Sequence, residues 1–134
     1  MSEHLIHLIG GSNDENATLT AERKKEACHI TFQYRGQSIE SEADDFFDAF
    51  CQIRLKLEQH GLIPLCYGAS LNVFPSGMSR SMGSGLRAYR LTVGRQALTG
   101  DLVSIFDSGP DVIPASVANQ KEYFDSWLAS LKVR

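Results

Sequence analysis

Residues 61–94 read GLIPLCYGASLNVFPSGMSRSMGSGLRAYRLTVG, two apolar runs on either side of a loop of glycine, serine, methionine and arginine. Six of the chain's eleven glycines lie in this stretch. Glycine is costly in ordered structure unless the backbone needs a positive φ or another group must come close. The composition therefore predicts a loop over 68–85 that is either shaped for a purpose or mobile, between strands at 62–67 and 86–93.

Strands are predicted on both sides of this central stretch. The segment 28–34 alternates apolar and polar residues with a period of two, which is typical of a half-buried strand, and a turn at 35–37 leads into a partner strand that carries Ile39. Further strands are expected at 5–9 and 102–106. The segment 17–27 is ambiguous between a strand and a helical turn, and we favour a strand that runs into a charged bend.

Two helices are predicted to pack against these strands. Ser41 precedes Asp44 by three positions, as in a capping box, so the first helix is expected to begin near Glu42 and to end at Gly61. Ser116 is expected to cap a final helix. No repeat or linker divides the chain. The sequence predicts one α+β domain over residues 1–134, with a mostly antiparallel sheet packed against two main helices.

The charge of the chain is unevenly distributed. The net charge of −3 over 134 residues does not favour nucleic acid as a partner. Residues 1–50 hold ten acidic and four basic residues, whereas 59–100 hold four arginines and no acid. Three cysteines within apolar runs indicate reduced core thiols rather than a disulfide framework. No signal peptide and no run of about 20 apolar residues is evident, so we expect a cytoplasmic protein without a membrane span.

Catalytic motifs are incomplete. Residues 83–88 have the G-x-G-x-x-A spacing of dinucleotide-binding proteins, but an extended segment follows where a helix is required. The region of Ser79 lacks G-x-S-x-G. His4 and His7, three residues apart, would point to opposite faces of a strand. We therefore predict no catalytic residue, no cofactor and no metal ligand. The alternative is a small enzyme, or an anion- or nucleotide-binding module, that uses the loop 76–90.

Two candidate interaction surfaces remain. One is the central loop, where methionines add apolar area to arginines that are able to bind anionic groups: Met78, Arg80, Met82 and Arg87. Its rival is an acidic cluster that would attract a basic partner: Glu42, Asp44, Asp45 and Asp48.

Five short segments of the chain resemble a known family of small bacterial proteins. They are PLCYGA at 64–69, NVFPSGM at 72–78, MGSG at 82–85, AYRL at 88–91 and SIFD at 104–107. The chain resembles, over about 60–134, the immunity proteins of contact-dependent growth inhibition and polymorphic toxin systems. The resemblance implies a non-enzymatic protein that binds a cognate toxin domain as a heterodimer, a nuclease being one candidate for the toxin. From the charge and the apolar pattern we expect no direct contact with nucleic acid and none with a membrane, and a homo-oligomer is not indicated.

Overall fold

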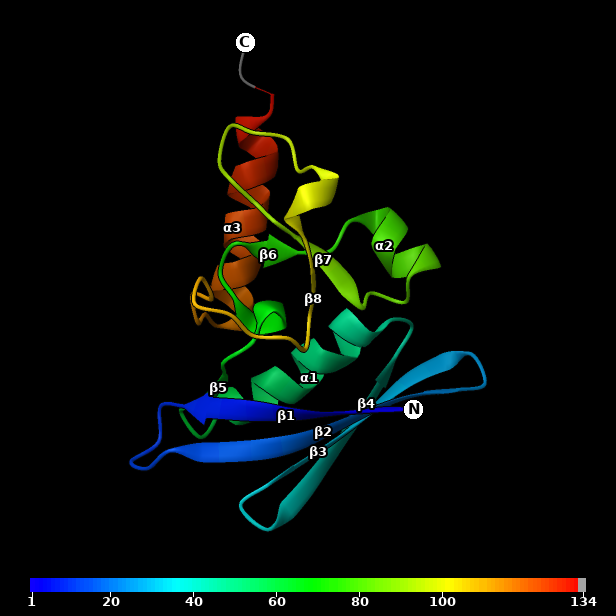
Figure 1. The fold of residues 1–134 in the computed structure, drawn as a ribbon, viewed down its shortest axis with the longest axis vertical. Coiled ribbons are helices and arrows are strands. Elements are labelled where there is room, and N and C mark those ends of the chain that lie inside the picture. Colours follow the sequence, from blue (N-terminus) through cyan, green and yellow to red (C-terminus); the bar gives the residue numbers. More distant parts are fainter. Residues whose placement is uncertain (133–134) are drawn as a thin grey trace.

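A five-stranded antiparallel sheet forms one end of the molecule in the computed structural model, which describes residues 1–132 (Figure 1). Its strand order is β4-β3-β2-β1-β5. The first four strands follow one another along the chain and pair with their sequence neighbours. The strands are β1 (Ser2–Ile9), β2 (Glu15–Lys24), β3 (Ala27–Tyr34), β4 (Gln37–Ala43) and β5 (Ile63–Pro64).

Helix α1 (Phe46–Glu58) covers one face of this sheet. The alternation of the strands directs apolar residues such as Leu19 and Phe32 toward the helix, which buries Phe50 and Ile53 against them. The helices lie on the same side of the sheet in Figure 1, so its outer face is not covered by a helix. That outer face carries mostly polar residues.

A second sheet of three antiparallel strands lies beyond α1. It contains β6 (Val73–Phe74), β7 (Arg87–Arg90) and β8 (Leu102–Ser104). Helix α2 (Gly77–Met82) connects β6 to β7, and short 3₁₀ helices occupy Tyr67–Ala69 and Thr99–Asp101. Helix α3 (Val117–Ser130) packs on the small sheet, where Phe124 stacks on Phe74 with 4.1 Å between the ring centroids.

A buried polar network joins the two parts of the domain. The Arg54 guanidinium, 1% exposed, donates to the carbonyl oxygens of Gly68 and Ala115 and to Oε1 of Gln120, at 2.6 Å. The Gln120 amide group lies within hydrogen-bond distance of three backbone carbonyl oxygens in 68–73. Because buried carbonyls need donors, this pair fixes the central stretch between α1 and α3.

The fold class is confirmed, with a sheet against helices in one small α+β domain, but several boundaries were wrong. Helix α1 begins at Phe46, with Asp45 as its N-cap, instead of near Glu42. The reason is that β4 continues to Ala43, where the pairing of Glu42 with His29 holds the backbone extended. The three strands predicted at 62–67, 86–93 and 102–106 are shorter than expected, since β5, β7 and β8 have two to four residues each.

The ambiguous segment 17–27 is resolved as two strands. Most of it belongs to β2, which leads through a turn at Lys25 (φ 57°) into β3. The predicted loop over 68–85 contains ordered elements, among them β6 and α2. Ser116 caps α3 as predicted and accepts a hydrogen bond from the Asn119 amide. Within residues 1–132, no helix combines the length and the apolar character that crossing a membrane requires.

Candidate partner-binding surface

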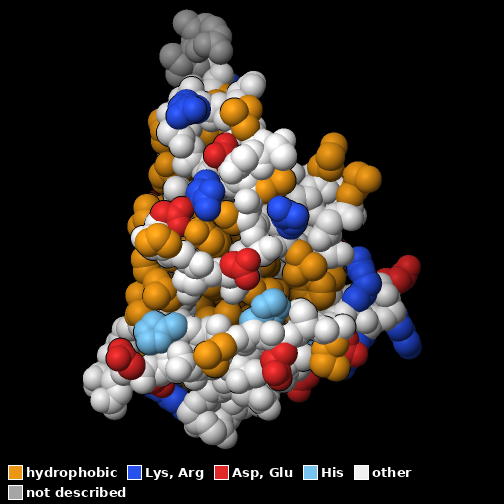
Figure 2. Space-filling model, in the orientation of Figure 1, with side chains coloured by type: hydrophobic (Ala, Val, Ile, Leu, Met, Phe, Trp, Pro, Cys, Tyr) orange, Lys and Arg blue, Asp and Glu red, His pale blue; other side chains and the backbone are white. Residues whose placement is uncertain are grey.

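Helix α2 is a short helix that presents two methionines to solvent. The Ser76 hydroxyl accepts a hydrogen bond from the Ser79 amide at 3.0 Å and caps the helix. The Ser79 hydroxyl donates to the carbonyl of Arg87 on β7, which ties the helix to the small sheet. Met78 is 71% exposed and Met82 is 81% exposed. Hydrophobic side chains accordingly protrude at α2 in Figure 2. The glycine- and serine-rich segment therefore contains a helix that is anchored to the small sheet.

Arg80 connects α2 to the start of α1. Its Nη1 lies 3.7 Å from Asp45 Oδ2 and 3.9 Å from Asp48 Oδ1. The guanidinium carbon is 5.2 Å from the ring centroid of Phe47 and 5.4 Å from that of Phe74, which are cation–π distances. Arg80 therefore links part of the acidic cluster to the methionine-bearing helix, and the two predicted surfaces meet at this residue.

Gly85 allows this close approach between the loop and α1. It has a φ of +71°, and a Cβ at this position would lie 2.8 Å from Asp45 Oδ1 and 3.1 Å from the Phe47 nitrogen. The carbonyl of Ser84 accepts a hydrogen bond from the Phe46 amide at 2.7 Å. One of the glycines in the central stretch is thus explained by both positive φ and lack of space.

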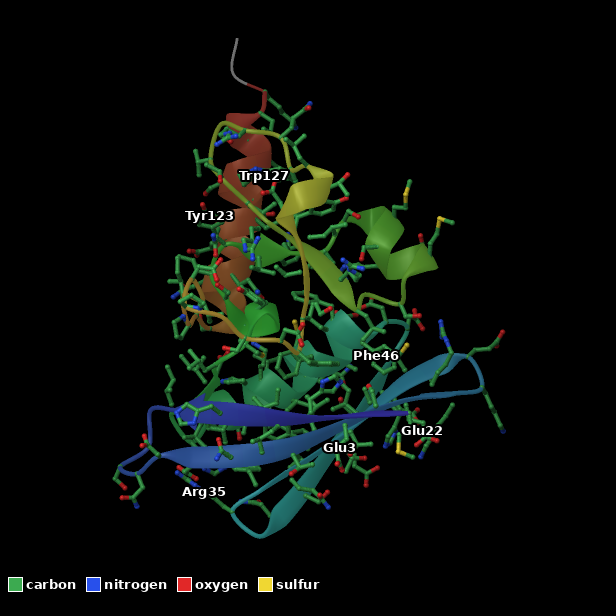
Figure 3. All side chains as sticks on the ribbon, in the orientation of Figure 1. Glu3, Glu22, Arg35, Phe46, Tyr123 and Trp127 are labelled. Atoms are coloured by element: carbon green, nitrogen blue, oxygen red, sulfur yellow. The ribbon has the colours of Figure 1, made fainter. Side chains whose placement is uncertain are left out.

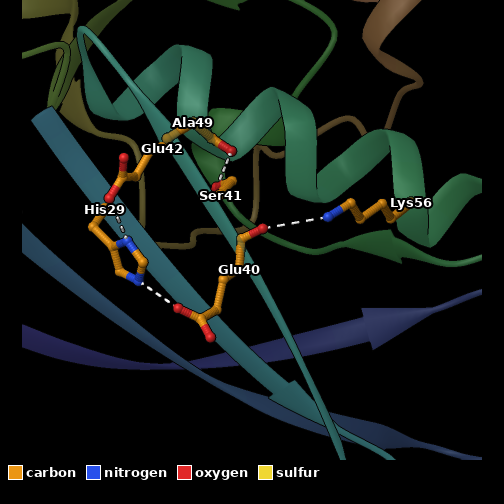
Figure 4. Close-up of polar contacts among 6 residues, drawn as sticks. All are labelled: His29, Glu40, Ser41, Glu42, Ala49 and Lys56. Carbon is orange, nitrogen blue, oxygen red and sulfur yellow. Dashed lines mark hydrogen bonds and ion pairs between the residues drawn. The ribbon is translucent and has the colours of Figure 1, made fainter.

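The other acidic residues of the predicted cluster lie elsewhere. Asp44 is exposed in the connection between β4 and α1. Glu42 points to the outer face of the sheet, where its Oε1 is 3.3 Å from Nδ1 of His29 (Figure 4). Glu40 approaches the other ring nitrogen of His29 at 2.8 Å. The structure therefore brings Asp45 and Asp48 together with Arg80 but separates Glu42 from them.

Two apolar grooves flank Tyr89 of β7. The first, of about 390 Å³, is lined by Met78, Met82, Arg87 and Leu102 among others. The second, of about 330 Å³, lies between the small sheet and α3 and is lined by aromatic side chains that include Phe74, Phe124 and Trp127. Both grooves contact Ser76 and Tyr89, so they form one surface. The sequence predicted the helix that carries Phe124 and Trp127, but only the fold reveals that these residues line a groove.

Arg90, the residue after Tyr89 on β7, forms an ion pair with Asp111. Arg90 Nε is 2.8 Å from Asp111 Oδ2, and the Tyr67 hydroxyl donates to Asp111 Oδ1 at 2.6 Å. The hydrogen bond from Tyr67, assisted by the charge of Arg90, lowers the pKa of the Asp111 carboxyl below its ordinary value. Arg90 is therefore occupied, whereas Arg87 is exposed and forms no ion pair within residues 1–132.

The residues that were weighed as nucleotide-binding or metal-binding lie in strands or next to them. The segment 83–88 runs into strand β7, so it lacks the helix that a dinucleotide-binding fingerprint requires. His4 contacts the Phe106 ring, while His7 bonds Asn16 on the other face of β1. No cluster of three or more potential metal ligands occurs within residues 1–132.

All three cysteines are free thiols. Cys28 and Cys66 are buried, and Cys51 is half-buried. Burial raises the pKa of Cys66 to about 12, which opposes formation of the reactive thiolate.

Comparison with known proteins gives no relative from which a function is transferable. No protein-family model matches the chain, and no curated protein matches it significantly in sequence. The function must therefore be argued from the surface itself.

Proposed function

We propose that this chain is an immunity protein that neutralises a cognate bacterial toxin domain by stoichiometric binding in the cytoplasm. It acts without turnover and forms a heterodimer with the toxin, for which a nuclease is one candidate. The proposal combines the sequence resemblance over about 60–134 with the character of the surface around α2. In this reading the partner covers the surface formed by Met78, Met82, Arg87 and Tyr89.

The observation that carries the proposal is the exposure of two methionines on an anchored helix. Met78 and Met82 are 71% and 81% exposed although the helix that bears them is held by Arg80 and Ser79. Methionine, tyrosine and arginine are enriched at protein–protein interfaces, and Met adapts to irregular partner surfaces. An ordered helix with this composition supports binding to a macromolecule.

The charges define the kind of partner surface that fits. Arg87 borders the groove beside the methionines and has no carboxylate partner within the described residues. A carboxylate on the toxin would form an ion pair with Arg87. Complementary charge accelerates association and sets specificity. Arg80 is a poor binding residue because Asp45, Asp48 and two aromatic rings already engage it.

The test is co-expression with the toxin domain that the proposal expects a neighbouring gene to encode, followed by titration of the purified proteins. Wild-type protein is expected to rescue growth and to bind the toxin one to one. Met82→Lys and Arg87→Glu are each expected to weaken binding by about tenfold or more, about 1.4 kcal/mol, which is more than most interface residues contribute. Leu128→Lys is the matched control, since Leu128 is 40% exposed on α3 and lines neither groove.

Two results would contradict the proposal. Failure of the wild-type protein to bind the toxin or to rescue growth would refute the proposed function. Equal loss of binding in Leu128→Lys and Met82→Lys would show that the α2 surface has no special role.

A further inference from the structure

Strand β1 has an edge that is paired over only a short length. Strand β5 pairs with Leu8 and Ile9, and the Leu65 amide donates to the carbonyl of His7 at 2.7 Å. Alternate residues of an antiparallel strand direct their N–H and C=O groups to the same side. Glu3 and Leu5 therefore direct theirs to the same edge as His7. Within residues 1–132 the N–H and C=O groups of Glu3 and Leu5 have no hydrogen-bond partner.

Helix α1 covers part of the opposite edge of the sheet, where its side chains bond two carbonyl groups of β4. Lys56 Nζ donates to the carbonyl of Glu40 at 3.3 Å, as drawn in Figure 4, and Gln52 Nε2 donates to the carbonyl of Glu42 at 3.1 Å. Proteins commonly protect sheet edges with such groups, or with lysine and proline on the edge strand. Strand β1 contains neither residue, and Leu5 is 73% exposed. The β4 edge is thus partly covered by α1, whereas the part of β1 that precedes His7 is open.

We propose that an extended segment of the toxin pairs with the open edge of β1 and adds a strand to the sheet. This inference rests on the proposed function, because the toxin is the partner that supplies the strand. The backbone groups of Glu3 and Leu5 would provide the hydrogen bonds, as in other cases of strand addition. Side chains two residues apart on the incoming strand would lie beside those of Glu3 and Leu5.

The outer face of the sheet defines the chemistry of the incoming strand. Glu3 lies in register with Thr20 of β2, Thr31 of β3 and Glu40 of β4. Glu3 and Glu22 lie on the side of the sheet away from the helices (Figure 3). This acidic face favours a lysine or arginine beside Glu3, whereas the exposed side chain of Leu5 favours an apolar neighbour.

The open edge is continuous with the α2 surface. Met1 and Ser2 line a shallow pocket of about 320 Å³ together with Phe46, Ser84 and Leu86. Leu86 immediately precedes Arg87, a residue of the proposed binding surface, and is 36% exposed. A single toxin domain is therefore able to contact α2 and to pair with β1.

A second copy of this chain fits the edge less well. Leu65 occupies the position beside His7, which limits free pairing to the part of β1 that precedes it. In an antiparallel pair of two copies, Glu3 would then face Leu5 or the Glu3 of the other copy. Neither arrangement neutralises the carboxylate, so a strand from a different protein is favoured.

The experiment compares Leu5→Pro with Leu5→Thr in titrations with the purified toxin. Proline at position 5 removes an outward N–H and leaves the bonds between β1 and β2 intact, a location in which edge strands tolerate proline. Threonine keeps the N–H, favours strands and removes most of the apolar side chain. Pairing predicts that Leu5→Pro weakens binding at least tenfold more than Leu5→Thr does. Unfolding of each free variant is measured as the control for folding.

Amide hydrogen exchange of the wild-type protein gives a second measurement that needs no variant. The Leu5 amide is expected to exchange rapidly in the free protein and at least about tenfold more slowly in the complex, because a new hydrogen bond protects it. The Ile6 amide faces β2 and is the internal reference, slow in both states.

The outcomes separate this inference from the proposed function. Equal affinities of Leu5→Pro and Leu5→Thr, or an unprotected Leu5 amide in the complex, would overturn strand addition while toxin binding stands. A wild-type protein that does not bind the toxin would overturn the proposed function and this inference with it.

Discussion

Substitution of Gly85 by alanine tests whether the loop after α2 is held tightly against α1. The φ of +71° at this position costs an L-residue about 1–2 kcal/mol. The added Cβ would also lie 2.8 Å from Asp45 Oδ1, too close without a shift of that side chain. Asp45 caps α1 by accepting from the Asp48 amide, and loss of such a cap costs about 1 kcal/mol. We therefore expect Gly85→Ala to lower the free energy of unfolding by about 2–3 kcal/mol.

Gly94→Ala is the matched control for this substitution. Gly94 has a φ of +84°, but no atom lies within 4 Å of the Cβ that alanine would add. The free energy of unfolding of Gly94→Ala should therefore fall only by the cost of the positive φ, about 1–2 kcal/mol. The difference between the two variants isolates the contact with α1.

Urea denaturation of both variants, compared at equal m-values, measures that difference. We also expect Gly85→Ala to bind the toxin more weakly than Gly94→Ala, since it displaces the loop that follows α2. Equal losses of stability in the two variants would refute the close approach and the positioning of α2 by α1.

Two further predictions concern polar groups. Arg54→Met should lower the free energy of unfolding by about 2 kcal/mol in urea titrations, because it leaves the buried acceptors Ala115 O and Gln120 Oε1 without a donor. Removal of the buried charge offsets part of this cost. Unchanged stability would contradict this expectation. The pKa of Asp111 is lowered by Tyr67 and then by Arg90, so the stability from these contacts is complete above the ordinary carboxyl pKa and is lost as pH falls through the folded value. Tyr67→Phe should raise the Asp111 titration midpoint measured by NMR, and an unchanged midpoint would refute the role of the hydroxyl.

The sequence predicted the elements whose pattern is local. Strand β3 was evident because Cys28–Tyr34 alternates along its whole length, and the Ser116 cap of α3 depends only on neighbouring residues. The start of α1 was misplaced because Ser41 and Asp45 are both acceptable caps. Pairing across to His29 decided between them, and that contact is not visible in the local sequence. The Ser41 hydroxyl instead donates to the carbonyl of Ala49 inside the domain (Figure 4).

The candidate surface was predicted residue by residue but not as an arrangement. The composition of the central stretch predicted a contact role for Met78, Met82, Arg87 and Arg80 alike. The structure shows the first three exposed. Arg80 instead binds Asp45 and Asp48, 35 and 32 positions earlier in the chain.

Because Arg80 pairs with Asp45 and Asp48, reversing its charge would disturb the fold as well as the surface. Arg80→Glu would place a third carboxylate beside Asp45 and Asp48, so any loss of toxin binding would combine a destabilised α2 with a lost contact. Arg87 has no ion-pair partner among residues 1–132, and its reversal changes the surface alone. Binding data for Arg87→Glu therefore report on recognition, whereas those for Arg80→Glu report first on the structure that presents the methionines.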